Sequence, residues 1–318
     1  MSIRRLPPFR QLYNAVEALH ESRRMLASLL ADRDQTRDAT MREGGERDAR
    51  LAAIDARLRR LDAALSAAQA QPVPPTPCEV AEVAIHERLG FRLLLDRQST
   101  IDRALIEQHG WEHEQLAYFS GLVERMRGRE GALFLDVGAY WGLYTLVAHR
   151  SGVFSSLLAV EADPHNFAQL QANLFLNDAA RVVRCIHKAA SLDARPLLLR
   201  DSRSHPDGNR GGTGVLPPNT TLPHVTVPAT SIDALLADVT GEPRDVLVKI
   251  DVEGFEAYVL QGMAETVRRH RVVMQVEIFD EHAPAAMAQL QRLGLVQIHR
   301  LYPDYWFTNH PDFLPAAT

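Results

Sequence analysis

The first 70 residues carry a helical pattern of apolar and polar positions. Apolar side chains recur at alternating steps of three and four residues in two stripes, apart from Arg23 at one position: Leu12, Val16, Leu19, Leu26 and Leu30, then Leu51, Ile54, Leu58, Leu61 and Leu65. This spacing is typical of the buried seam of a coiled coil. Between the stripes, arginines occupy seam positions, and Gly44 and Gly45 disfavour a continuous helix. Residues 1–70 are therefore predicted to form a helical hairpin, a self-associating stalk or a solvated charged helix.

The pattern changes after residue 70. Residues 71–79 contain four prolines, which favour an extended spacer and indicate a domain boundary. In residues 80–318, short apolar runs alternate with helical patterns, and the runs cover residues 133–137, 157–160, 182–186, 246–250 and 272–278. Strands that alternate with helices predict a mostly parallel, doubly wound α/β sheet.

The end of the chain departs from this alternation. Residues 296–301 and 305–308 are two strand candidates on either side of a Tyr-Pro-Asp turn, which predicts an antiparallel hairpin. The predicted fold is therefore an α/β domain with a doubly wound sheet and a C-terminal hairpin, preceded by an α-helical, coiled-coil-like region.

Composition excludes several classes of protein. A hydrophobic fraction of 46% and a charged fraction of 24% are those of a folded globular protein. The net charge of -5 and the absence of a basic cluster predict no nucleic-acid partner. No stretch reaches the roughly 18 apolar residues that a membrane-spanning helix needs, and the two cysteines form no metal-binding motif. We expect a cytoplasmic protein that forms homo-oligomers or docks a partner through its N-terminal helices.

A glycine-containing turn follows the first strand of the α/β region. Asp136 ends that strand, and Gly138 and Gly142 precede a helical segment. A ligand can approach the backbone closely where side chains are absent, and there it meets the free amides at the start of the helix. Asp136 could bind the ammonium group of a ligand or order the turn. The same pattern also fits a purely structural turn.

An acidic residue ends the next strand, about twenty residues further on. Glu161 is placed to bind a ribose diol, whereas Asp163 and Pro164 suit the N-cap and first position of a helix. The glycine spacing differs from the G-x-G-x-x-G pattern of dinucleotide-binding folds. These features favour a nucleoside cofactor with a cationic amino-acid part over a dinucleotide.

Three segments together resemble the FkbM family of methyltransferases: Asp136-Val-Gly-Ala-Tyr-Trp-Gly-Leu-Tyr-Thr145, Val160-Glu-Ala-Asp-Pro164 and Lys249-Ile-Asp-Val-Glu-Gly-Phe-Glu256. The resemblance extends from about Asp96 to Phe307 and includes Gly110-Trp111-Glu112, a helix start at Ser231 and Glu277. It implies a class I methyltransferase fold, S-adenosylmethionine as methyl donor, and a hydroxyl acceptor on a sugar, a glycan or a small natural product.

The same resemblance implies positions for the cofactor. Tyr144 and Thr145 belong to the glycine-turn motif, and Ala189 with its neighbours should line the adenine pocket. Many family members carry asparagine where this chain has Tyr140. A polar contact to the cofactor is therefore expected to be replaced, shifted or lost at this position.

Carboxylates at two strand ends are the candidate catalytic groups. Asp251 and Glu253 follow the strand at 246–250 and should emerge at the sheet edge where open α/β proteins bind ligands. Methyl transfer requires alignment of the acceptor and removal of its proton, which a carboxylate can accept. The alternative is that acidic residues simply stabilise the start of the next helix.

Two further residues complete the predicted site. Lys249 lies two positions before Asp251, so both side chains should share one face of the strand. It could form an ion pair with Asp251 or bind the acceptor. Glu277 ends the next strand and could join Asp251 and Glu253 around a hard cation such as magnesium.

A long polar segment, residues 201–221, gives no clear acceptor signal. Its glycines and prolines suit a lid or a mobile surface loop, and the side chains of Arg203, His205, Asn209 and Arg210 would suit a sugar or phosphorylated acceptor. Two other classes of function remain open. One is a non-catalytic scaffold with a cofactor fold. The other is a nucleotide-dependent oxidoreductase, although this sequence lacks the dinucleotide-binding motif of that class.

Overall fold

The computed structural model describes residues 56, 82–108, 111–238 and 243–314. The predictions for residues 1–70 and the spacer at 71–79 lie outside these residues, apart from residue 56. No helix in the described part of the chain has the length and apolarity to cross a bilayer.

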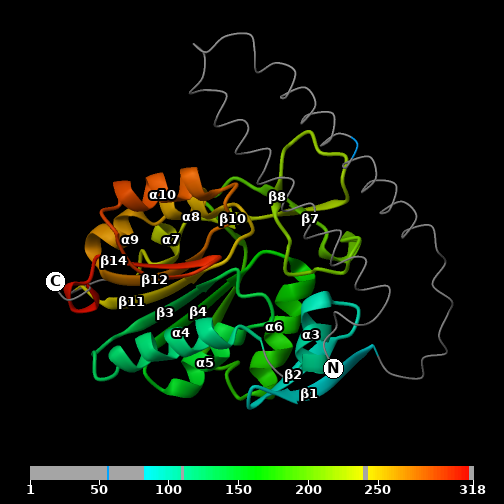
Figure 1. Ribbon diagram of the computed structural model, residues 1–318, viewed down its shortest axis with the longest axis horizontal. Coiled ribbons are helices and arrows are strands. Elements are labelled where there is room, and N and C mark those ends of the chain that lie inside the picture. The colour runs from blue at the N-terminus through cyan, green and yellow to red at the C-terminus, as the bar shows by residue number, and fades with distance from the viewer. Residues whose placement is uncertain (1–55, 57–81, 109–110, 239–242, 315–318) are drawn as a thin grey trace, which may run out of the picture. The chain divides into compact units, whose positions relative to one another are not determined.

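A seven-stranded sheet forms the centre of the described region (Figure 1). Its spatial order is β13-β14-β12-β11-β3-β4-β5. The strands are β3 (Leu133–Val137), β4 (Ser156–Glu161), β5 (Val183–His187), β11 (Asp245–Ile250), β12 (Arg271–Glu277), β13 (Val296–Leu301) and β14 (Asp304–Thr308). β14 runs antiparallel to its neighbours β12 and β13, and all other neighbouring strands of this sheet are parallel. All seven predicted strands and the terminal hairpin are confirmed.

The strand order reverses between β3 and β11. From β3 the chain adds β4 and β5 on one side, and it then returns to add β11 and β12 on the other. In open α/β sheets the ligand crevice lies beyond the carboxyl ends of the strands at such a reversal. The topology therefore brings the ends of β3, β4 and β11 to one edge.

Helices cover both faces of the sheet (Figure 1). On one face pack α4 (His113–Arg125), α5 (Leu143–Ser151) and α6 (Pro164–Leu176). On the other pack α7 (Ile232–Leu235), α8 (Glu256–Gln261), α9 (Ala264–Arg269) and α10 (Ala283–Arg292). Because successive side chains of a strand point to opposite faces, Phe134 joins the first core and Leu133 and Leu135 join the second. Burial on both faces explains why β3 is apolar apart from Asp136 near its carboxyl end.

Smaller elements complete the region. β1 (Val83–Arg88) and β2 (Phe91–Asp96) form an antiparallel hairpin, followed by α3 (Thr100–Gln108). β7 (Leu197–Arg200) pairs with β8 (Val215–Leu216) and β9 (His224–Val227), and β6 (Ala189–Ala190) pairs with β10 (Ala229–Thr230). The polar segment at 201–221 thus contributes β8 and a 3₁₀ turn, Ser202–Ser204, instead of being wholly irregular.

Candidate active site

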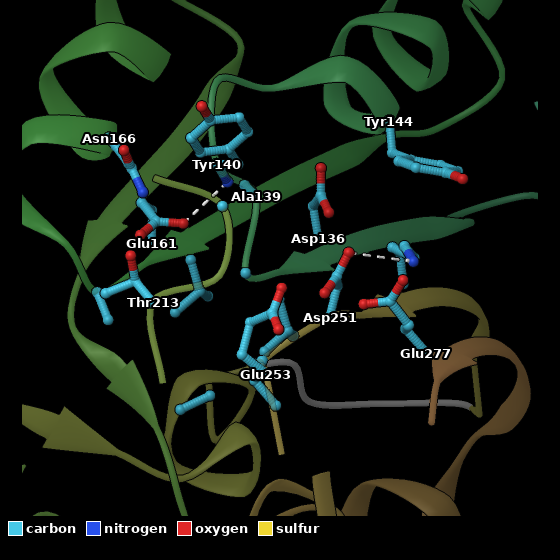
Figure 2. Close-up of a pocket in the computed structure, with 18 of the residues that line it drawn as sticks. Asp136, Ala139, Tyr140, Tyr144, Glu161, Asn166, Thr213, Asp251, Glu253 and Glu277 are labelled. Atoms are coloured by element: carbon cyan, nitrogen blue, oxygen red, sulfur yellow. Dashed lines mark hydrogen bonds and ion pairs between the residues drawn. The ribbon is translucent and has the colours of Figure 1, made fainter. Parts of the chain in front are cut away.

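A pocket opens at the carboxyl edge of the sheet (Figure 2). Its lining includes all but two of the residues predicted from the sequence: Asp136, Gly138, Tyr140, Tyr144, Glu161, Ala189, Lys249, Asp251, Glu253 and Glu277. The strand reversal brings them together from five separate segments of the chain. The close-up shows Glu161 and Tyr144 on opposite sides of the site, with Asp136 between them.

The glycine turn packs tightly against the end of β11. Gly138 has a φ of 78°, and a Cβ atom built there would lie 1.7 Å from the backbone oxygen of Asp251. Only glycine fits this close approach. The N–H of Asp251 also donates a hydrogen bond of 2.9 Å to the backbone oxygen of Val137. The turn and the candidate catalytic strand end are therefore held in fixed register.

Gly142 and Thr145 are the two other predicted residues, and they lie next to residues of the pocket lining. Thr145 Oγ1 donates a 2.5 Å hydrogen bond to Asp136 Oδ2. Gly142 has a φ of 96° directly before α5, and a Cβ there would lie 2.7 Å from Leu170 Cδ1. Neither residue is part of the pocket lining, so their contribution is to the orientation of Asp136 and the turn.

Glu161 lies at the end of β4 with both carboxylate oxygens engaged by backbone amides. Oε2 accepts from the N–H of Tyr140 at 2.8 Å, and Oε1 accepts from the N–H of Asp163 at 2.8 Å. Burial raises the pKa of Glu161 to about 7 despite these bonds. Each oxygen retains a further lone pair for a hydroxyl donor. Asp163 itself caps α6 by accepting from two backbone amides, as predicted.

The side chain of Tyr140 bonds to residues at and beside the start of α3. Its hydroxyl donates to Asp102 Oδ1 at 3.0 Å and lies 2.8 Å from Ser99 Oγ. Asp102, in α3, is fully buried and also accepts from the backbone N–H of Asp96 and from Gln169 Nε2. Tyr140 therefore anchors the turn to α3, and its backbone amide holds Glu161.

Lys249 is a buried cation between two carboxylates. Its Nζ lies 3.0 Å from Asp304 Oδ1 and 3.5 Å from Asp251 Oδ2. Burial alone lowers the pKa of Lys249, but Asp251 and Asp304 raise it well above its usual value. The expected ion pair with Asp251 is present, together with one to Asp304 in β14 that the sequence did not indicate.

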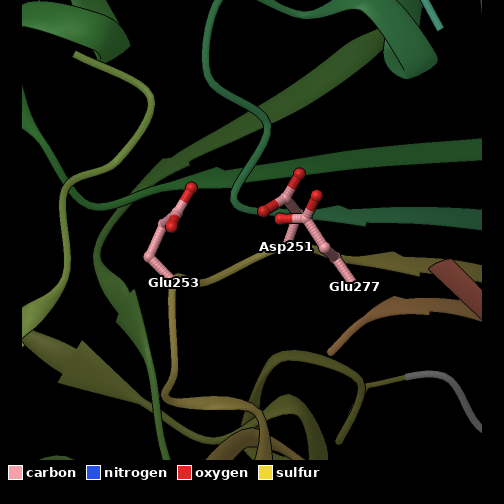
Figure 3. A group of neighbouring side chains, drawn as sticks. All are labelled: Asp251, Glu253 and Glu277. Atoms are coloured by element: carbon pink, nitrogen blue, oxygen red, sulfur yellow. The ribbon is translucent and has the colours of Figure 1, made fainter. Parts of the chain in front are cut away.

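Three carboxyl groups converge beside Lys249 (Figure 3). Oxygens of Asp251, Glu253 and Glu277 lie within 4.8 Å of one another. Burial, with the charge of Asp251 adding to it, raises the pKa of Glu253 to about 8 and that of Glu277 to about 11. Glu253 also has a positive φ of 52°. The cluster can accept a proton near neutral pH or, by its oxygen donors, hold a hard cation, although Lys249 already supplies a positive charge to Asp251.

The polar segment at 201–221 contributes residues other than those expected. Gly211, Thr213 and Val215 line the pocket. By contrast, three of the four residues that could contact a methyl acceptor lie beside acidic side chains instead. These pairs are Arg203 with Asp201, His205 with Asp207, and Arg210 with Asp96. The fourth, Asn209, accepts from the backbone N–H of Gly212.

Several lining residues were not assigned to the site from the sequence. They are Trp111, Glu112, Asn166 and Thr213, among others. Trp111 and Glu112 belong to the family resemblance, which was the one signal that could have found them. Asn166 and Thr213 are isolated polar residues with no spacing or neighbour that marks them.

The strand order, the pocket at the reversal and the acidic strand ends define a methyltransferase-type α/β domain. The chain matches the methyltransferase FkbM domain over residues 136–295, which is 160 of its 318 residues. It therefore belongs to the FkbM methyltransferase family, and methyl transfer is the reaction of that family. The predicted resemblance is confirmed.

Among solved structures, similarity is distant. Precorrin-6y C5,15-methyltransferase from Geobacter metallireducens has 14% identity and a TM-score of 0.34, covering 60% of this chain and 86% of its own. A putative methyltransferase from Streptococcus mutans in complex with SAH has 10% identity and a TM-score of 0.38, covering 61% and 95%. TYW2 of M. jannaschii in complex with AdoMet has 13% identity and a TM-score of 0.36, covering 73% and 85%. No curated protein matches the chain.

Proposed function

We propose that this protein transfers a methyl group from S-adenosylmethionine to a hydroxyl group of a sugar, a glycan or a small natural product. The observation that carries the proposal is that Glu161, Asp251 and Glu253 line the same pocket. One end suits a nucleoside, and the carboxylates lie where an acceptor can be deprotonated.

The chain's own groups fit the cofactor in the following way. Glu161 would accept the ribose hydroxyls through the lone pairs left by its two amide bonds, and Ala189 would line the adenine region. Asp136, held by Thr145, would bind the ammonium group of the methionine part. The cofactor supplies an electrophilic methyl group on a sulfonium, which needs no further activation.

Glu253 is our candidate for the general base. As the acceptor oxygen forms its bond to the methyl carbon, the carbon–sulfur bond breaks and its electron pair stays on sulfur. The hydroxyl proton passes to the Glu253 carboxylate. A base with a pKa of about 8 is well matched to this task at neutral to mildly alkaline pH. Lys249 holds Asp251 beside it and keeps the cluster from accumulating negative charge.

An assay with S-adenosylmethionine labelled in the methyl group tests the proposal against a panel of sugars, glycans and hydroxylated natural products. We expect label in an ether-linked methyl group of at least one acceptor, with S-adenosylhomocysteine formed in equal amount. The alternative is a non-catalytic scaffold that docks partners through residues 1–70. Tight cofactor binding without transfer to any acceptor class would favour that alternative.

A further inference from the structure

Glu112 occupies an unusual position at the start of α4. Its φ of 48° and ψ of 43° place it in the left-handed region, which a residue with a side chain adopts only at a cost. The residue stands at the N-cap of α4, yet its side chain makes no capping hydrogen bond. Instead the side chain lines the pocket. The strained backbone thus directs a carboxylate into the site and not onto its own helix.

In the part of the chain that the structure describes, the hydrogen-bond donors to the carboxylate of Glu112 are neutral. Trp111 Nε1 donates to Oε1 at 2.8 Å, and the Tyr144 hydroxyl donates to Oε2 at 2.7 Å. Within the described residues, no basic side chain forms an ion pair with it. Burial raises its pKa, and the charge of Lys249 only partly offsets this effect. A carboxylate that is largely shielded from water and has no direct ionic partner is stabilised when a ligand supplies a positive charge.

The neighbours of Glu112 locate it at the end of the pocket away from Glu161. Tyr144 connects it to Gln275, whose Nε2 lies 3.1 Å from the Tyr144 hydroxyl. Gln275 Nε2 in turn donates to Asp304 Oδ1 at 2.7 Å, and Asp304 is the main partner of Lys249. Figure 2 shows Tyr144 on the side of the site opposite Glu161. The charged groups that act on Glu112 at this end are Lys249 and the carboxylates of Asp251 and Asp304.

Together with Glu112, the carboxylates outnumber the lysine at this end, and such a site matches the ammonium of an amino-acid group. We propose that Glu112 is a cofactor-binding residue that contacts the α-ammonium of the methionine part of S-adenosylmethionine. Trp111 and Tyr144 orient the Glu112 carboxylate for this contact. The inference rests on the proposed function and extends the site beyond the segment matched by the family.

Two ligands separate this contact from a general effect on the pocket. S-adenosylhomocysteine carries the amino-acid group, whereas 5′-methylthioadenosine has the same adenosine and thioether but no ammonium. We would measure both affinities by calorimetry for the full-length wild type and for Glu112→Gln, which keeps the shape and removes the charge. Glu114→Gln is the matched control, because Glu114 is an exposed carboxylate in the same helix.

We expect Glu112→Gln to weaken S-adenosylhomocysteine binding by about 10- to 100-fold, the effect of losing a charged hydrogen bond. Binding of 5′-methylthioadenosine should change less than about twofold, because this ligand has no ammonium group to bond with Glu112. This result would also show that the variant is folded. Glu114→Gln should match the wild type with both ligands.

Unchanged S-adenosylhomocysteine affinity in Glu112→Gln, or an equal loss with both ligands, would overturn the ammonium contact alone. A wild-type protein that binds 5′-methylthioadenosine as tightly as S-adenosylhomocysteine would also overturn it. Failure of the wild type to bind either ligand would overturn the proposed function as well, so the two failures are distinguishable.

Discussion

The pH dependence of methyl transfer should report the ionisation of Glu253. Burial, followed by the charges of Asp251 and Glu256, raises the pKa of Glu253 to about 8. A base with this pKa is ionised in about one molecule in eleven at pH 7 and in about ten of eleven at pH 9. The value of kcat/KM for the cofactor, which reports the free enzyme, should therefore rise about tenfold between these pH values. A sulfonium bound beside the carboxylate should shift the profile of kcat to lower pH.

The perturbation is Glu253→Gln, which preserves the shape of the side chain but cannot take a proton. We expect turnover to fall by about 10² to 10⁴-fold, the usual contribution of a general base, and the alkaline rise in rate to disappear. Affinity for S-adenosylhomocysteine should change little. Glu265→Gln is a suitable control, because Glu265 is an exposed carboxylate in α9 outside the pocket.

Asp251→Asn should also reduce turnover more than cofactor affinity, since Asp251 lies beside Glu253 and is held by Lys249. If both variants keep wild-type turnover and the alkaline rise, another group accepts the proton and the carboxylates are structural. Treatment of the wild type with a chelator separates two explanations of a loss. Inactivation that magnesium reverses would show that the carboxylate cluster binds a cation. Unchanged activity would indicate that the cluster serves proton transfer.

The raised pKa of Glu253 also predicts the sign of a stability effect. A folded-state pKa above the unfolded value of 4.5 gives a contribution to stability that is complete below pH 4.5 and is lost as the pH rises through about 8. The melting temperature of the ligand-free protein should therefore fall between pH 5 and pH 9, and Glu253→Gln should make this fall smaller. A steeper fall in the variant would contradict the assignment.

Three other predictions follow from the site and the sequence pattern. S-adenosylhomocysteine at a hundred times its dissociation constant should stabilise the fold by about 2.7 kcal/mol, seen as a higher melting temperature, whereas NAD should have no effect. Glu161→Ala should weaken S-adenosylhomocysteine binding by about 1 to 3 kcal/mol in calorimetry, and unchanged affinity in a folded variant would remove Glu161 from the site. Residues 1–70 should govern self-association or partner docking but not cofactor binding. Light scattering on the full chain and on a chain starting at residue 80 tests this prediction. An unchanged oligomeric state would argue against a self-associating stalk.

Local features of the fold were predictable because their causes are local. An apolar run such as 133–137 can be buried on both faces only as a strand between two layers of helices. Asp163 before Pro164 identifies the start of α6 because the N-cap needs a side-chain acceptor and the first turn tolerates proline. Spacing alone also placed Lys249 and Asp251 on one face of β11, since side chains alternate along a strand.

The roles of several residues depended on partners far along the chain. The phenol of Tyr140 bonds to Asp102, and Lys249 bonds to Asp304, 55 residues away. No periodicity records which distant residue will face a given side chain. The sequence therefore identified Tyr140 and Lys249 as candidates for the site but could not indicate the contact of Tyr140 with Asp102 or that of Lys249 with Asp304.

By itself, the sequence determined the strands, the helix starts, the glycine turn and the acidic strand ends, because each depends on residues within a few positions of one another. The sequence also offered Asp251, Glu253 and Glu277 as one group, but only the tertiary structure added Glu112 and showed which carboxylates have counter-charges. The ionisation of Glu253 and Glu277 depends on burial and on the charge of Asp251, which act through space. The same reason explains Glu112: its approach to Lys249 follows from the packing of α4 beside the sheet, where electrostatic energy depends on distance and not on order along the chain.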